Sequence, residues 1–205
     1  MTHLLIWWCL GSAVAALACL CCPPKWLRGN LLLTLLTLLC LAWVVASGAL
    51  AVALRTYAVF TREEPVATVA CVRLDGMPPH FQVRYTPVGQ PGTNLSPQTF
   101  ELVGDQWTVS GEILKWHPWL TLAGFRPVHK PTRISGRFAN IALERALQPT
   151  AFDLNGGTDF LWSCLHRYGR WLPFAEAVYG NDVFTYADPD RTFTIYITPS
   201  GYIVK

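Results

Sequence analysis

The chain has 205 residues, of which 52% are hydrophobic, and a formal net charge of +3. All of the excess charge comes from Lys25, Arg28 and Arg55, because residues 56–205 hold thirteen Lys or Arg and thirteen Asp or Glu. This balance argues against a nucleic-acid binder, for which a basic folded part is expected. Beyond the apolar first quarter, about 150 residues remain, which is a common size for a single domain.

Residues 4–22 form an uncharged apolar run that is long enough to cross a bilayer as a helix. A cleaved signal peptide is the alternative interpretation. However, the start Met-Thr-His lacks the cation of an n-region, and the segment that ends at Cys19 only loosely resembles a lipoprotein cleavage site. We therefore expect an uncleaved helix over residues 4–22.

Residues 31–54 form a second apolar run without any ionisable acid or base. As a helix this run would be roughly 36 Å long, enough to span a hydrocarbon layer of about 30 Å with some tilt. The connection over residues 23–30 is short and begins with two prolines. The sequence thus predicts a transmembrane hairpin over residues 1–55, followed by an extramembrane domain over residues 56–205.

The orientation of the hairpin follows from its flanking charges. Lys25 and Arg28 favour a cytoplasmic loop between the helices, whereas Arg55 and Arg62 flank the far end of the second helix. Long translocated domains are largely exempt from this charge rule. We expect the domain to lie outside the cytoplasm.

Alternating hydrophobicity begins after residue 56 and predicts a strand-rich α+β domain. Strands are expected over residues 66–74 and 81–88, joined by a turn, and an exposed linker over residues 89–98. Residues 191–198 and 202–204 read as a terminal hairpin around Pro199-Ser200-Gly201.

A further hairpin is predicted over residues 99–114. A two-residue turn at Gly104-Asp105 would set Leu102 opposite Trp107 and Phe100 opposite Val109, so that apolar residues share one face.

One helix of the domain has clear boundaries, over residues 158–168. Thr158 or Asp159 can cap its start, and Gly169 stands where it would end. Leu161, Leu165 and Tyr168 would share its apolar face. Residues 134–147 fit either a strand or a short helix.

Five cations occur between Glu112 and Glu144 without an intervening acid, next to two tryptophans that suit a membrane interface. One interpretation is a contact surface for anionic lipid or an acidic partner; the other is that acids neutralise these cations in the fold. The residues of this candidate contact site are Lys115, Trp116, Trp119, Arg126, Lys130, Arg133 and Arg137.

Catalytic and metal-binding motifs are absent from the sequence. His80, His117, His129 and His166 are scattered, and the chain contains no GxSxG, HExxH, SxxK or GxxxxGK pattern. We expect no catalytic residue, metal or cofactor. Cys71 and Cys164 permit either one disulfide or two free thiols.

The apolar runs carry no ionisable residue of the kind that marks a transport pathway. The hairpin alone is therefore not expected to be a pump. Small residues such as Ser47 and Gly48 suit helix packing instead, either within the hairpin or against another membrane protein.

Five short segments resemble a group of two-helix inner-membrane proteins of Pseudomonas-like proteobacteria, which often bear the names cation/multidrug efflux pump or multidrug transporter. These segments are residues 104–107, 115–116, 133–138, 177–180 and 200–203. Family members have Tyr where Phe138 stands and a more basic loop between the helices. The resemblance implies a multi-pass protein of the bacterial inner membrane, with the domain expected in the periplasm, and assigns no active residue.

Together these patterns predict a membrane-tethered, non-catalytic interaction or accessory protein. Its expected partners are the lipid bilayer and, as a second candidate, another membrane protein. One alternative is an accessory subunit of an efflux system. The other is a membrane-anchored enzyme, which would gather residues such as His117, His166 and Asp159 in a deep pocket.

Overall fold

The computed structural model describes residues 11, 14, 31–88, 96–156 and 159–205. The chain divides into two compact units, residues 1–58 and 59–205. Each unit is treated by itself below.

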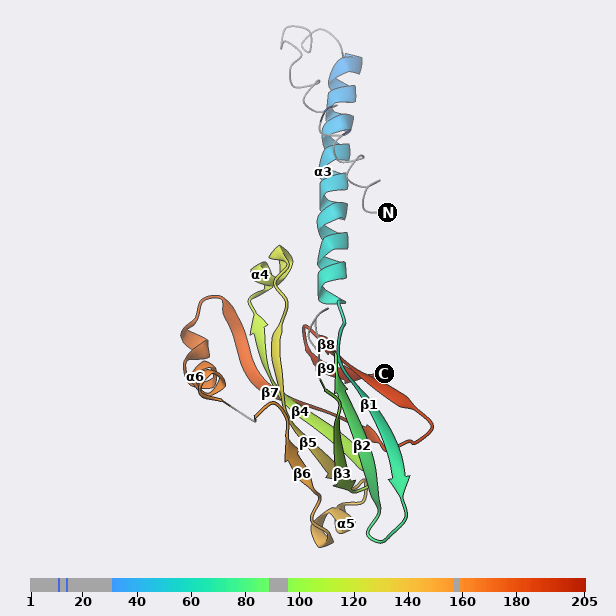
Figure 1. Ribbon diagram of the computed structural model, residues 1–205. Coiled ribbons are helices and arrows are strands. Elements are labelled where there is room, and N and C mark those ends of the chain that lie inside the picture. The colour runs from blue at the N-terminus through green and yellow to red at the C-terminus, as the bar shows by residue number, and fades with distance from the viewer. Residues whose placement is uncertain (1–10, 12–13, 15–30, 89–95, 157–158) are drawn as a thin grey trace. The chain divides into compact units, whose positions relative to one another are not determined.

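Most of α3 (Leu31–Phe60) belongs to the first unit (Figure 1). Its apolar side chains are exposed along most of its length. Residues 34–60 are long and apolar enough to cross a membrane. The helix runs six residues beyond the predicted end at Leu54, since no helix-breaking residue occurs before Pro65. The predicted helix over residues 4–22 lies outside the described residues except for Gly11 and Val14, so the two-helix hairpin stays a prediction.

Two antiparallel sheets form the second unit (Figure 1). The first sheet has the strand order β3-β2-β1-β8-β9. Its strands are β1 (Glu64–Leu74), β2 (His80–Pro87), β3 (Gln98–Val103), β8 (Thr192–Thr198) and β9 (Gly201–Val204). The predicted pairing of the segments around residues 66–74 and 81–88 is confirmed, as is the terminal hairpin. Residues 89–95 of the predicted linker lie outside the described residues.

The second sheet has the order β6-β5-β4-β7. Its strands are β4 (Gln106–Trp116), β5 (Val128–Arg137), β6 (Ala151–Asp153) and β7 (Ala175–Tyr186). Strand β7 was not expected from the sequence, and of β5 only residues 134–137 fall in the segment 134–147 that fits either a strand or a short helix. Both interrupt the hydrophobic alternation, β5 with Pro131 and β7 with Gly180-Asn181-Asp182.

The core lies between the two sheets. Trp107, Tyr85, Leu102, Ile113 and Ile134 are its largest fully buried side chains. Trp107 packs edge-on against Phe193 of the opposite sheet, with ring centroids 5.8 Å apart. Because alternate residues of each strand point inward, the core forms without burying the charged residues between them.

The predicted hairpin over residues 99–114 is wrong. β3 pairs with β2 and β4 pairs with β5 and β7, so Gly104-Asp105 is a corner that carries the chain from one sheet to the other. Gly104 has φ +149, and a side chain there would overlap the backbone of Arg137. Leu102 and Trp107 do face the same core, as expected, but from different sheets.

The described residues of the domain also form four short helical segments: α4 (Pro118–Ala123), α5 (Ile141–Ala146), α6 (Phe160–Tyr168) and the 3₁₀ turn η1 (Gly169–Trp171). The helix predicted near residues 158–168 is confirmed as α6, and the Asp159 carboxylate accepts a hydrogen bond from the Trp162 amide at 3.1 Å. Its predicted apolar face is wrong. Trp162 is the buried residue, while Leu161 and Tyr168 are exposed.

Both cysteines of the domain are free thiols, which decides between the two alternatives left by the sequence. Cys71 is buried in the core and Cys164 is half-buried on α6.

Candidate functional site

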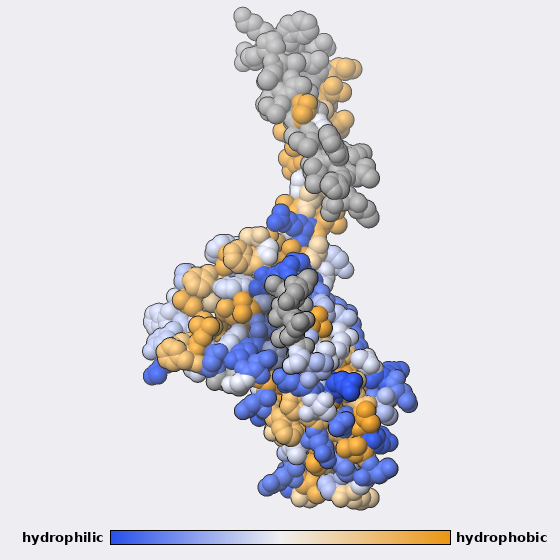
Figure 2. All heavy atoms as spheres, in the orientation of Figure 1, coloured by the Kyte–Doolittle hydropathy of each residue, from blue (hydrophilic) through white to orange (hydrophobic). Residues whose placement is uncertain are grey.

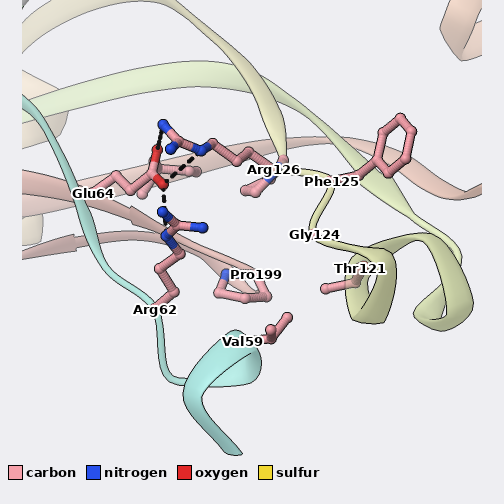
Figure 3. A pocket seen from close by; sticks show the side chains of 10 residues that line it. Val59, Arg62, Glu64, Thr121, Gly124, Phe125, Arg126 and Pro199 are labelled. Carbon is pink, nitrogen blue, oxygen red and sulfur yellow. Dashed lines mark hydrogen bonds and ion pairs between the residues drawn. The ribbon is translucent and has the colours of Figure 1, made fainter. Parts of the chain in front are cut away.

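The candidate site lies at the end of the domain where β1 begins, which we call the tether end. Here α4 links β4 to β5, and the turn between β8 and β9 lies beside them around a small cavity (Figure 3). The cavity has a volume of about 30 Å³. That is room for a water molecule and not for a substrate.

Glu64 holds these segments together through two arginines. Its Oε1 lies 2.9 Å from Arg62 Nε and 3.2 Å from Arg126 Nε, and Arg126 Nη1 donates to Oε2 at 3.4 Å. Figure 3 shows the carboxylate between the two guanidinium groups. Because two cations share one carboxylate, this cluster keeps a net positive charge.

Trp116 organises the aromatic part of the tether end. Its indole Nε1 donates to the Arg126 carbonyl at 2.6 Å, which fixes the turn that carries Arg126. The Trp116 ring lies 6.1 Å from the rings of both Phe125 and Phe174. Phe125 points away from the ion cluster (Figure 3), and Trp119 on α4 is exposed.

The other predicted contact residues do not join this cluster. Lys115 pairs with Glu176 and Lys130 with Asp159, both at 2.9 Å. The Arg137 guanidinium lies 4.5 Å from the ring centroid of Phe184. The predicted site residues are therefore dispersed over the domain. Trp116 and Arg126 are in contact, and Trp119 lies on α4 with its ring 6.3 Å from that of His117.

Arg133 lies in a separate hollow on the outer face of the second sheet. The hollow has a volume of about 340 Å³ and is also lined by Glu112, Asp153 and Asp182. It contains none of the residues that the enzyme alternative would bring together.

Those candidate catalytic residues take separate partners. His166 Nε2 lies 2.5 Å from Glu112 Oε2, Asp159 binds Lys130, and the His117 ring lies 6.3 Å from that of Trp119. Burial lowers the pKa of His129, which favours the neutral imidazole, and its Nδ1 lies 3.3 Å from the Tyr202 hydroxyl. Within the described part of the chain, no three His, Cys, Asp or Glu side chains are placed to hold a metal ion.

Several residues of the tether end were not predicted as part of a site. Arg62 was expected only as a charge that flanks the second helix, and Phe125 and Phe174 belong to segments far apart in the chain. No local pattern places Phe174 beside Trp116, because that contact depends on the pairing of β4 with β7.

Comparisons with protein-family models, with curated proteins and with solved structures find no match to this chain. The interpretation of the tether end therefore depends on its geometry and charge.

Proposed function

We propose that this protein is a membrane-tethered, non-catalytic interaction module. The observation that carries the proposal is the short connection between an apolar helix and a folded domain: only residues 61–63 separate the end of α3 from β1. Extended backbone between Phe60 and Glu64 reaches about 14 Å at most. If α3 spans a bilayer, the tether end is held next to the bilayer surface.

The length of α3 fits this role. Its 30 residues form a helix about 45 Å long, which matches the hydrocarbon core together with both headgroup layers. Arg55 is its one charged residue and lies in the last third, where a cation can reach the headgroups.

The tether end supports an interaction role more than a catalytic one. Its cavity holds about a water molecule, and the ionic groups around it bind one another. What remains accessible is a set of aromatic side chains and arginines, the residue types that are enriched where proteins meet other molecules.

In its finer form, the proposal places the domain outside the cytoplasm of a bacterium, with a two-helix hairpin in the inner membrane. The apolar run over residues 4–22, the cations of the connecting loop and the resemblance to two-helix inner-membrane proteins support this form.

The experiment that tests the proposal is cysteine labelling of the full chain in spheroplasts. Asp190, exposed in the loop after β7, and Thr2 are replaced singly by Cys, with the native cysteines changed to alanine or serine. We expect both variants to be in the membrane fraction and to react with a membrane-impermeant maleimide. Recovery in the soluble fraction would contradict the tether, and labelling of position 190 only after lysis would contradict the orientation.

A further inference from the structure

We infer that the occupant of the tether end is the bilayer surface itself, and that an aromatic rim of four side chains enters the headgroup layer. This inference rests on the proposed tether. The rim consists of Trp119, Phe125, Trp171 and Phe174, whose exposed fractions are 56%, 53%, 73% and 40%. Figure 2 shows hydrophobic side chains gathered on the part of the domain that holds α4 and α6.

Contacts within the domain bring the rim to one end. The His117 amide donates to the Phe174 carbonyl at 2.9 Å, so the base of α4 adjoins the start of β7. Trp116 lies between Phe125 and Phe174, and η1 with Trp171 leads directly into β7. Figure 1 shows α4 and the start of β7 at the same end of the second sheet.

The type and position of the rim residues favour lipid over a protein partner. Large aromatic side chains that are exposed at separate points suit a soft surface more than a shaped one. Tryptophan in particular prefers the headgroup layer, where its ring is amphipathic. The connection over residues 61–63 keeps the start of β1 within about 14 Å of the end of α3. Arg126, next to Phe125 of the rim, binds Glu64 at that start.

The charges near the rim fit an anionic surface. Arg62 and Arg126 share the single carboxylate of Glu64. Arg167 on α6 contacts the ring of Tyr168, at 5.9 Å, and no carboxylate among the described residues. The acids at this end, Glu63 and Glu176, are paired with Lys205 and Lys115. Phosphatidylglycerol headgroups would therefore meet cations and not free carboxylates.

The experiment uses the full chain in vesicles of phosphatidylcholine and phosphatidylglycerol. Single cysteines replace exposed neighbours of the rim, Ala123 and Pro173, and carry an environment-sensitive fluorophore. Met77, exposed at the opposite end of the domain, gives the matched control position, and Val45 reports on α3. Nitroxide attached to the lipid headgroups quenches a fluorophore that lies in the headgroup layer.

We expect quenching at positions 123 and 173 to be about threefold stronger than at position 77. Changing Phe125 and Trp171 together to serine should remove that difference, whereas Phe160→Ser, an exposed aromatic outside the rim, should leave it. Equal quenching at positions 123, 173 and 77 would overturn the inference.

The control in α3 separates the two proposals. Strong quenching at position 45 by nitroxide placed along the acyl chains, with none at the rim, leaves the tether intact and rejects the rim. Absence of quenching at position 45 rejects both. An emission shift at the rim that grows with protein density and not with lipid quencher would mean that a second copy covers it, which also overturns the inference.

Discussion

Thr108 carries a hydroxyl that the fold leaves without compensation. The residue is 9% exposed, and its Oγ1 is buried without a hydrogen-bond partner among the described residues. Thr108 lies between Trp107 and Val109 in β4, so the alternation of the strand directs its side chain away from the core. In the structure the Thr108 side chain is nevertheless buried. Its hydroxyl loses its hydrogen bonds to water on folding and gains none in return, which lowers the stability of the folded state.

Replacing Thr108 by valine should therefore stabilise the domain. Removal of an unpartnered buried hydroxyl with the shape kept is expected to raise the free energy of unfolding by about 1 kcal/mol. The matched control is Thr132→Val, which loses the hydrogen bond from Thr132 Oγ1 to the Ser110 carbonyl at 3.3 Å and should lower stability. Urea unfolding of the full chain in detergent micelles measures both. A loss of stability in Thr108→Val would contradict this reading.

At the scale of elements, periodicity predicted faces better than it predicted partners. The alternation in residues 99–114 correctly set Leu102 and Trp107 towards a core, yet two strands joined by a short turn separate into different sheets. An alternation with a period of two residues predicts which face of a strand is buried, but it does not predict which other strand pairs with it. The sharp corner at Gly104 decided the pairing.

Helix α6 illustrates the same limit. Its N-terminal cap could be predicted from the sequence, because the Asp159 carboxylate accepts a hydrogen bond from the Trp162 amide only three residues away. Its buried face could not be predicted, because the helix lies against the second sheet through Trp162 and through the pairs His166–Glu112 and Lys130–Asp159. Trp162 is the one buried side chain of this nine-residue helix, and Phe160, Leu161 and Tyr168 are exposed.

Trp162 should accordingly be the anchor of α6. Trp162→Ala is expected to lower the free energy of unfolding by about 3 kcal/mol, because a large buried ring is lost. Leu161→Ala, at the neighbouring exposed position, should change it by less than about 0.5 kcal/mol. Thermal or urea unfolding compares the two, and equal effects would show that the helix does not depend on this anchor.

For the whole molecule, the alkaline limit of stability follows from three buried groups. Burial, and then the charge of Asp188, raises the pKa of the Cys71 thiol from 9.0 to about 11. Burial raises the pKa of Tyr85 from 10.0 to about 12, and that of Tyr202 is also raised. At neutral pH these groups are protonated in both the folded and the unfolded state. As the pH rises, they ionise first in the unfolded chain, because their pKa values are lower there.

Stability should thus be unaffected by Cys71 below pH 9.0 and fall as the pH rises towards about 11. Urea unfolding across this range, with Cys71→Val as the comparison, measures the thiol's share. The valine variant should show a shallower decline. An identical decline in both proteins would assign the effect to the tyrosines alone.

The apolar helix α3 and the candidate site differ in how far the sequence could predict them. An uncharged run of this length is readable from composition, and α3 follows it closely. The contact site was predicted as one continuous segment, but β5 spreads Lys130, Arg133 and Arg137 over the face of a sheet. The tether end is formed by three segments, around residues 62, 126 and 174, that only the tertiary fold brings together.

The most direct test of the central claim is the accessibility of α3 in a bilayer. Nitroxide labels at Leu39, Val45 and Leu50, exposed along the helix, are examined one at a time in the full chain reconstituted in vesicles. We predict high accessibility to oxygen and low accessibility to a water-soluble nickel chelate, as for side chains that face lipid. Accessibility to nickel, or protection from both reagents, would show that the helix lies in water or inside protein and would contradict the account.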